Sequence, residues 1–283
     1  METEPPLERA EAFRPWHTPS PREDCCPARR PILRALDVTV SYGGTTALRN
    51  VSLGINRGCI TAIVGPSGCG KSTFLMSLNR MTDLVGSASV IGDIRLDEQP
   101  VLGDAVDLLA LRRRVGLIAQ RPNPFPLSIR RNMTFPLREH GVSDRARQTE
   151  IMEECLHRVG LWTEVRDRLD RPALGLSGGQ QQRLCLARAL ALEPEVLLLD
   201  EPCSALDPMA SAIIEGLIEE LRGRYTIVIV THNLAQARRI ADDMALFWAT
   251  DGVGTLVEAG TAEQLFTRPC EALTRAYVSG MRG

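Results

Sequence analysis

A glycine-rich segment, Gly65–Ser72, limits the folds open to this chain more than any other stretch. Its sequence, GPSGCGKS, fits the pattern G-x-x-x-x-G-K-[ST]. The apolar, β-rich run at residues 59–64 predicts a buried strand before it, and residues 72–78 predict the start of a helix after it. A strand, a glycine-rich turn and a helix N-terminus together direct backbone N–H groups and a partial positive charge at one point. The segment therefore predicts a binding site for a nucleoside triphosphate.

The residue types of this segment have separate chemical roles. The Lys71 ammonium would reach the β- and γ-phosphates, and the Ser72 hydroxyl would hold Mg²⁺. Because Cys69 lies inside the segment, modification of its thiol is expected to block nucleotide binding. The predicted nucleotide-binding residues are Gly65, Pro66, Ser67, Gly68, Cys69, Gly70, Lys71, Ser72 and Thr73.

Two adjacent carboxylates follow a second apolar run, at residues 195–199. Asp200 at the end of this predicted strand suits a water-mediated grip on Mg²⁺, as in a Walker B strand. Glu201 is placed to polarise a water for in-line attack on the γ-phosphate, and Pro202 ends the strand there. The pair predicts hydrolysis of the bound triphosphate, with Glu201 as the catalytic carboxylate and Asp200 as a metal ligand.

A second anion-binding helix N-terminus is predicted upstream, in the segment Leu176–Arg183 with the sequence LSGGQQQR. Ser177 is a favourable N-cap, and Gly178 and Gly179 expose backbone N–H groups before the helix continues. With this motif the chain resembles the ATP-binding subunits of ABC transporters, whose signature is LSGGQ. The resemblance covers roughly residues 32–280 and implies that the nucleotide also contacts Ser177, Gly178, Gly179 and Gln180.

The resemblance assigns roles to four further residues, which occur in the family's order along the chain. Tyr42 matches the aromatic residue that stacks on adenine, and Asp207 ends the D-loop, which crosses the dimer interface. Gln120 matches the glutamine that touches Mg²⁺ and the attacking water. His232 matches the histidine that contacts the γ-phosphate. The implied catalytic residues are Glu201, His232, Gln120 and Lys71, and the implied Mg²⁺ ligands are Ser72, Gln120 and Asp200.

These features predict an α/β fold, namely a P-loop NTPase with a RecA-like core. An antiparallel β subdomain is expected from residues 33–53, and a helical subdomain that bears the signature from approximately 121–180. We expect one ABC ATPase domain at residues 32–280 and a disordered N-terminal extension at residues 1–31, which is rich in Pro, Glu and Arg. Within the helical subdomain, residues 144–156 predict a helix with Ser143 as its cap.

Composition excludes several other classes of protein. The net charge is −2, without a basic patch, so no nucleic-acid partner is expected. No apolar stretch approaches the roughly 18 to 20 residues needed to span a bilayer, and no signal peptide is evident. We therefore expect a peripheral protein at the cytoplasmic face of the cell membrane, attached through a partner.

The resemblance also implies an assembly. Two ATPase subunits would pack head to tail as a homodimer around two ATP molecules, each held by the P-loop of one chain and the signature of the other. ATP would close the dimer and hydrolysis would open it. The implied partners are two integral membrane permease subunits and a separate solute-binding protein that supplies the cargo.

The cargo is inferred from the segments beside the shared motifs. Residues 79–81, 122–126 (PNPFP) and 201–208 are similar to the ATPase subunits of bacterial phosphate importers. The alternating prolines predict an extended loop that presents Phe125 outward. Arg130–Arg131 and Asp97–Glu98 depart from the family's pattern, which expects an aromatic-acidic pair and a turn glycine there.

Two alternatives stay open from the sequence. An importer ATPase for another small polar solute would share every catalytic residue. A non-transport ABC ATPase that acts on DNA or ribosomes is the other class. The short segment between Gln120 and Ser177, without sustained heptads, and the single ATPase unit count against that class.

Overall fold

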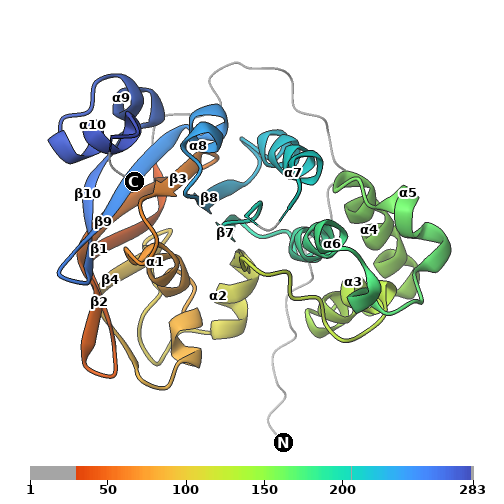
Figure 1. Cartoon of the computed structure of the whole chain (residues 1–283). Coiled ribbons are helices and arrows are strands. Elements are labelled where there is room, and N and C mark those ends of the chain that lie inside the picture. The colour runs from red at the N-terminus through yellow and green to blue at the C-terminus, as the bar shows by residue number, and fades with distance from the viewer. Residues whose placement is uncertain (1–29, 205, 282–283) are drawn as a thin grey trace, which may run out of the picture.

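A computed structural model describes residues 30–204 and 206–281 of the chain. These residues form one mixed sheet in the order β5-β4-β1-β2-β10-β9-β3-β8-β7-β6, with helices on its faces (Figure 1). The strands are β1 (Pro31–Tyr42), β2 (Thr45–Asn56), β3 (Ile60–Val64), β4 (Ala88–Leu96), β5 (Gln99–Pro100), β6 (Val115–Ile118), β7 (Val196–Asp200), β8 (Thr226–Val230), β9 (Asp243–Thr250) and β10 (Val253–Thr261).

One half of the sheet is parallel, with β9, β3, β8, β7 and β6 in succession. All five residues of β3 and of β8 are buried, as expected where both faces of a parallel sheet are covered. Ala62 faces a core cluster that includes α4 and α6, whereas the next residue, Ile63, faces a second cluster with α1 and the β-layer. This sandwich confirms the predicted α/β class.

In the other half, β1, β2, β4 and β5 form the expected antiparallel layer, and β10 joins it through a parallel bridge to β2. β1 pairs with β2 on one side and with β4 on the other, both antiparallel. The β4–β5 hairpin turns at Asp97 and Glu98, whose φ values of 47° and 64° are left-handed. Two positive φ angles in succession define a type I′ turn, so these residues build the hairpin without the expected glycine.

The helices lie between the strands and, from α3 to α6, form a separate group at the right of Figure 1. Asp144, not Ser143, caps α4, because its carboxylate accepts the Ala146 N–H at 3.0 Å. The helices are α1 (Lys71–Ser77), α2 (Leu108–Arg114), α3 (Ile129–Glu139), α4 (Arg145–Arg158), α5 (Trp162–Val165), α6 (Gly178–Leu190), α7 (Pro208–Glu220), α8 (Leu234–Ile240), α9 (Ala262–Thr267) and α10 (Ala272–Val278), with 3₁₀ turns at Met81–Leu84, Arg166–Arg168 and Ala173–Gly175.

The domain limits stay a prediction. The proposed N-terminal extension lies outside the described residues except for Arg30 and Pro31, and β1 begins at Pro31. Within 30–204 and 206–281, no helix is both long and apolar enough to cross a bilayer.

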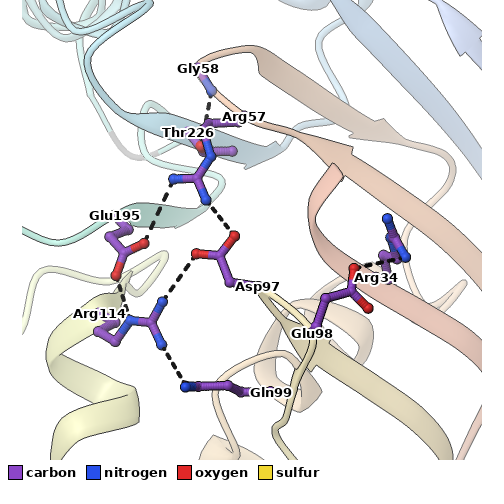
Figure 2. A network of polar contacts seen from close by, with 9 residues as sticks. All are labelled: Arg34, Arg57, Gly58, Asp97, Glu98, Gln99, Arg114, Glu195 and Thr226. Atoms are coloured by element: carbon purple, nitrogen blue, oxygen red, sulfur yellow. Dashed lines mark hydrogen bonds and ion pairs between the residues drawn. The ribbon is translucent and has the colours of Figure 1, made fainter. Parts of the chain in front are cut away.

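A network of charged side chains joins the β-layer to the parallel half at the end of the strands opposite the P-loop (Figure 2). Asp97 at the hairpin turn pairs with Arg57 and, at 3.3 Å, with Arg114. Arg114 also pairs with Glu195, just before β7, and donates to Gln99 at 3.1 Å. The hairpin turn is thus tied by charge to the start of the parallel strands.

Candidate active site

The turn between β3 and α1 requires glycine at two positions. Gly65 has φ 146°, and a Cβ there would lie 2.1 Å from the carbonyl oxygen of Phe247. Gly70, the residue before α1, has φ 89°, and its Cβ would lie 2.7 Å from Leu48. Both conformations are strained for residues with a side chain, and both positions are sterically closed. The packing of β9 and β2 therefore fixes the shape of the P-loop.

Lys71 begins α1 and lies inside the turn. Its ammonium donates to the carbonyl oxygens of Gly65 and Pro66, each at 2.8 Å, and the residue is only 5% exposed. Cys69 is fully buried beside it, with its sulfur 3.9 Å from the Lys71 nitrogen. The positive charge is therefore held within the loop, where backbone N–H groups of a helix N-terminus also attract anions.

The end of β7 brings Asp200 against the start of α1. The Ser72 hydroxyl donates to Asp200 Oδ1 at 2.9 Å. Burial raises the pKa of Asp200 and the charge of Glu201 raises it further, while the Ser72 hydrogen bond and Lys71 act in the opposite direction. A raised pKa means that the surroundings disfavour the charged form of this carboxylate, so a cation bound nearby would stabilise it.

Glu201 is held in an unusual backbone conformation directly after β7. Its φ is 44°, in the left-handed region, although it precedes a proline. Its N–H donates to the carbonyl oxygen of Val230 at 3.0 Å, and its own carbonyl oxygen accepts from the Ser204 hydroxyl at 3.1 Å. Such strain persists only where surrounding bonds enforce it, and it is concentrated at functional sites.

The Glu201 carboxylate is the meeting point of two other predicted catalytic residues. Gln120 Nε2 donates to Glu201 Oε2 at 3.0 Å, and His232 Nδ1 lies 3.2 Å from the same oxygen. Glu201 is 15% exposed and His232 60% exposed, so the carboxylate lies deeper than the imidazole. These residues follow β7, β6 and β8, whose carboxyl ends share one edge of the sheet.

A cavity of about 710 Å³ adjoins these residues, a size suited to a small-molecule ligand. It shares a wall at Glu201 and His232 with a second cavity of about 440 Å³. The predicted residues that line the larger cavity are Gly65, Pro66, Ser67, Gly68, Gly70, Lys71, Ser72, Thr73, Gln120, Glu201 and His232. Lining residues that the sequence did not indicate are Ala47, Leu234, Gly252, Tyr277 and Gly280.

The aromatic residue beside the P-loop comes from the C-terminal helix. Tyr277 in α10 is 5% exposed and stands edge-on to Trp248, with 6.1 Å between ring centroids. Burial raises the pKa of Tyr277, and the Gly65 backbone beside its hydroxyl partly offsets that effect. Tyr42, at the end of β1, is half-buried and is not among the described residues that line the cavity. Its predicted contact with adenine stays a prediction.

The signature segment is built as a capped helix away from this cavity. Ser177 Oγ accepts the Gln180 N–H at 3.3 Å, and Gln180 Oε1 accepts the Ser177 N–H at 3.0 Å, which makes a capping box. Ser177 and Gly178 are exposed, and a Cβ at Gly179 would lie 3.2 Å from Ala210 of α7. In Figure 1, α6 lies toward α3–α5, on the far side of β7 from α1.

The D-loop residue Asp207 lies at the start of α7. Its carboxylate accepts the N–H groups of Met209 and Ala210, at 2.9 and 3.0 Å, and so acts as the N-cap. Because Ala210 also adjoins Gly179, Asp207 is close to the signature segment in this chain. Asp207 and residues 177–180 are not among the described residues that line the larger cavity.

The loop after Gln120 is fastened to α6. The expectation that Phe125 points outward is wrong, because Phe125 packs edge-on against Phe135 at 5.9 Å and under the Arg188 guanidinium at 4.2 Å. Asn132 accepts the Phe125 N–H at 2.7 Å. Arg130, one of the two unexpected arginines, pairs with Asp170 at 2.9 Å.

The fold and the cavity define a P-loop ATPase with a separate, glycine-rich signature helix. A family model described as ABC transporter matches residues 48–204. The phosphate import ATP-binding protein PstB 1 of Nitrosococcus oceani is 60% identical over 259 residues, which make up 92% of this chain and 93% of that protein. The solved structure of cbiO1 from Clostridium perfringens, part of the ABC transporter complex cbiONQ, is similar with a TM-score of 0.70. The two chains are 28% identical, and the matched region covers 84% of this chain and 91% of the cbiO1 chain.

The chain belongs to the ABC transporter family of ATP-binding proteins. It is a nucleotide-binding, ATP-hydrolysing transport subunit, as predicted from its motifs. The mixed α/β sheet and the likeness to cbiO1 agree with the predicted P-loop NTPase fold.

Proposed function

We propose that this chain is the motor subunit of an importer that drives inorganic phosphate uptake across the cytoplasmic membrane. The observation that supports the cargo is the 60% identity, over 92% of the chain, to a protein named for phosphate import. The observation that supports the activity is the meeting of Gln120 and His232 on the Glu201 carboxylate, at one cavity with Lys71.

The P-loop would bind the triphosphate, with Lys71 at the β- and γ-phosphates. Glu201 would accept the proton of the attacking water, while Gln120 holds the carboxylate and His232 contacts the γ-phosphate. Because phosphoryl transfer depends mostly on positioning and charge, the enforced backbone at Glu201 is well suited to this role.

Mg²⁺ fits the residues beside the P-loop. The hydroxyl of Ser72, the carboxylate of Asp200 and the amide oxygen of Gln120 are the hard oxygen donors that this ion prefers. Asp200 is partly buried, and among its described neighbours only Lys71 offers a compensating positive charge, so a bound cation suits this position. When bound, the ion would neutralise charge on the phosphates.

The signature segment would act on a second chain. Ser177, Gly178, Gly179 and Gln180 lie on α6 away from the cavity, so in a head-to-tail homodimer they would face the ATP held by the partner. Asp207 would lie at that interface, because it caps α7 beside Gly179. Binding of two ATP molecules would close the dimer, and hydrolysis would release it.

The proposed partners are two integral membrane permease subunits and a solute-binding protein that delivers phosphate, with no nucleic acid. The motor would sit as a peripheral protein on the cytoplasmic face. The loop at residues 121–128 is the proposed permease contact, since Arg188 fastens it to α6 and Gln120 at its start reaches Glu201. A movement of the permease could thereby reach the catalytic carboxylate.

The cargo is tested by labelled-phosphate uptake at low external phosphate, in cells that lack this gene. Complementation with the wild-type chain should restore uptake, Glu201→Gln should not, and uptake of a labelled amino acid should not respond to either. If phosphate uptake does not depend on the gene while amino-acid uptake does, the motor serves a different small polar solute.

The catalytic assignment is tested on the purified chain. Glu201→Gln should keep ATP binding and reduce turnover by roughly 10²- to 10⁴-fold, the usual range for loss of a general base. Steady-state hydrolysis at the wild-type rate by this variant would refute the role of Glu201.

A further inference from the structure

The carboxylate of Glu164, in the short helix α5, binds two side chains of the signature helix α6. Its Oε2 accepts from Gln180 Nε2 at 2.6 Å, and its Oε1 accepts from Arg183 Nη2 at 2.8 Å. Gln180 and Arg183 are three residues apart on α6 and therefore lie on the same face of the helix. One carboxylate thus holds the first turn of α6 and the turn that follows it.

The Gln180 side chain connects the Glu164 carboxylate to the signature loop. Its amide has one acceptor and one donor end, and the acceptor, Oε1, takes the Ser177 N–H. That leaves the NH₂ end for Glu164. If the amide were reversed, its NH₂ group would face the Ser177 N–H and its oxygen would face the Glu164 carboxylate, and neither hydrogen bond could form. The carboxylate therefore selects the amide orientation that closes the capping box.

The charge of Glu164 is stable in this setting. Burial acts to raise the pKa of Glu164, but the hydrogen bonds from Arg183 and Gln180 outweigh it and leave that pKa below its ordinary value. Arg183 is 8% exposed in its side chain and donates to the Gly160 carbonyl oxygen at 2.7 Å, so it is a fixed partner. Hydrogen bonds to charged groups are among the stronger ones in proteins.

We propose that Glu164 is a positioning residue for ATP-dependent dimer closure. Through Gln180 it keeps the capping box at Ser177 closed, so that the Ser177 hydroxyl and the first N–H groups of α6 stay directed at the partner's nucleotide. This inference rests on the proposed function, in which that loop meets ATP across the dimer. It assigns Glu164 no contact with the nucleotide of its own chain.

The experiment uses the full-length chain with Glu201→Gln, in which ATP should drive dimer formation without turnover. Dimerisation is followed by sedimentation velocity against ATP concentration, and ATP binding to the dilute monomer by a fluorescent analogue. Adding Glu164→Gln should raise the ATP concentration for half-dimerisation about tenfold, as expected for one weakened charged hydrogen bond, and leave monomer affinity unchanged. Glu164→Asp keeps the charge but shortens the reach, and should act the same way.

The matched control is Asp170→Asn. It removes another ion-paired carboxylate, the partner of Arg130, which precedes the signature segment in the chain, and should leave half-dimerisation unchanged. In a Gln180→Leu background, Glu164→Gln should cause no further loss, because the connection to Ser177 is already cut.

Three outcomes would overturn the inference. Unchanged dimerisation by both Glu164 variants would show that the capping box does not need the carboxylate. An undiminished effect in the Gln180→Leu background would show that Glu164 acts through Arg183 and general packing. If the Glu201→Gln chain itself fails to dimerise with ATP, the head-to-tail assembly of the proposed function fails first, and the inference fails with it.

Discussion

The Ser72 hydroxyl donates to Asp200 across 2.9 Å, joining two residues 128 positions apart in the chain. Ser72 belongs to the first turn of α1, after β3, and Asp200 is the last residue of β7. β8 lies between these strands in the sheet, so the contact spans its carboxyl edge. In open parallel sheets this edge is where ligands bind.

Asp200→Asn should separate nucleotide binding from metal-dependent hydrolysis. Asparagine keeps the shape and can still accept from Ser72, but it removes the charge proposed to hold Mg²⁺. We expect Mg²⁺-dependent ATP hydrolysis to fall at least about 100-fold, as for loss of an electrostatic group at a reacting phosphate. ATP affinity measured with a chelator present should not change. Hydrolysis within about twofold of the wild type would contradict the assignment.

Tyr277→Phe should weaken ATP binding more than turnover. The variant keeps the ring against Trp248 and removes the hydroxyl that faces the Gly65 backbone. Since the loss of one polar contact costs no more than roughly the 0.5–1.5 kcal/mol of a hydrogen bond, KM for ATP should rise about 2- to 10-fold with kcat little changed. Tyr225→Phe is the control, because Tyr225 is equally buried at 3% exposure but lies outside the cavity lining. Equal KM values for both variants would exclude a role for the Tyr277 hydroxyl.

Much of this site was predictable because its parts are local or follow from sheet topology. Gly65–Thr73 form a continuous turn and helix start directly after β3, so the cavity that all of them except Cys69 line follows from sequence. Glu201 and His232 follow the parallel strands β7 and β8, whose carboxyl ends share one edge of the RecA-like core that the sequence predicted. The role of Tyr277 had no sequence signal, since only the docking of α10 on the P-loop places it in the cavity.

Other details depended on side-chain competition that a pattern does not reveal. The alternating prolines predicted the extended loop but not the direction of Phe125, which the Arg188 guanidinium on α6 determines. Asp144 replaces Ser143 as the cap of α4 because the carboxylate of the following residue reaches the free Ala146 N–H. The Glu164 contact with Gln180 likewise joins two helices that local periodicity treats separately.

Asp97→Asn should destabilise the β-layer without affecting the active site. Asparagine tolerates the left-handed turn, so the change removes mainly the pairs with Arg57 and Arg114. Because these side chains are partly exposed, the free energy of unfolding should fall by only about 0.5–1 kcal/mol, and ATPase activity should not change. The loss should shrink in about 0.5 M salt, which screens such pairs.

The matched control for this variant is Glu98→Gln, in the same turn. Glu98 pairs with Arg34 at 3.0 Å, and both side chains are well exposed. Chemical denaturation should show a smaller change than for Asp97→Asn. If the two variants lose equal stability, the turn conformation rather than the network in Figure 2 determines the effect.

Cys69 should react slowly with alkylating reagents, although its modification is expected to block nucleotide binding. Burial raises the pKa of the Cys69 thiol, and the nearby positive charge of Lys71 only partly offsets this. Since the thiolate is the nucleophile, a raised pKa lowers the reactive fraction of Cys69 at any given pH. The alkylation rate should therefore keep rising as the pH passes 9.0, the ordinary thiol pKa. Peptide mapping after iodoacetamide treatment should show Cys69 at least about tenfold slower than Cys270, which is free and exposed.

The consequence of modifying Cys69 follows from the packing of the P-loop. The sulfur is fully buried, and a Cβ on Gly65 would already lie 2.9 Å from it, so an added carbamidomethyl group must displace the turn. Protein alkylated at Cys69 should therefore lose ATP binding, whereas the same treatment of a Cys69→Ala variant should leave binding intact. Unchanged nucleotide affinity after complete alkylation of Cys69 would mean that the turn can open and still bind the phosphates.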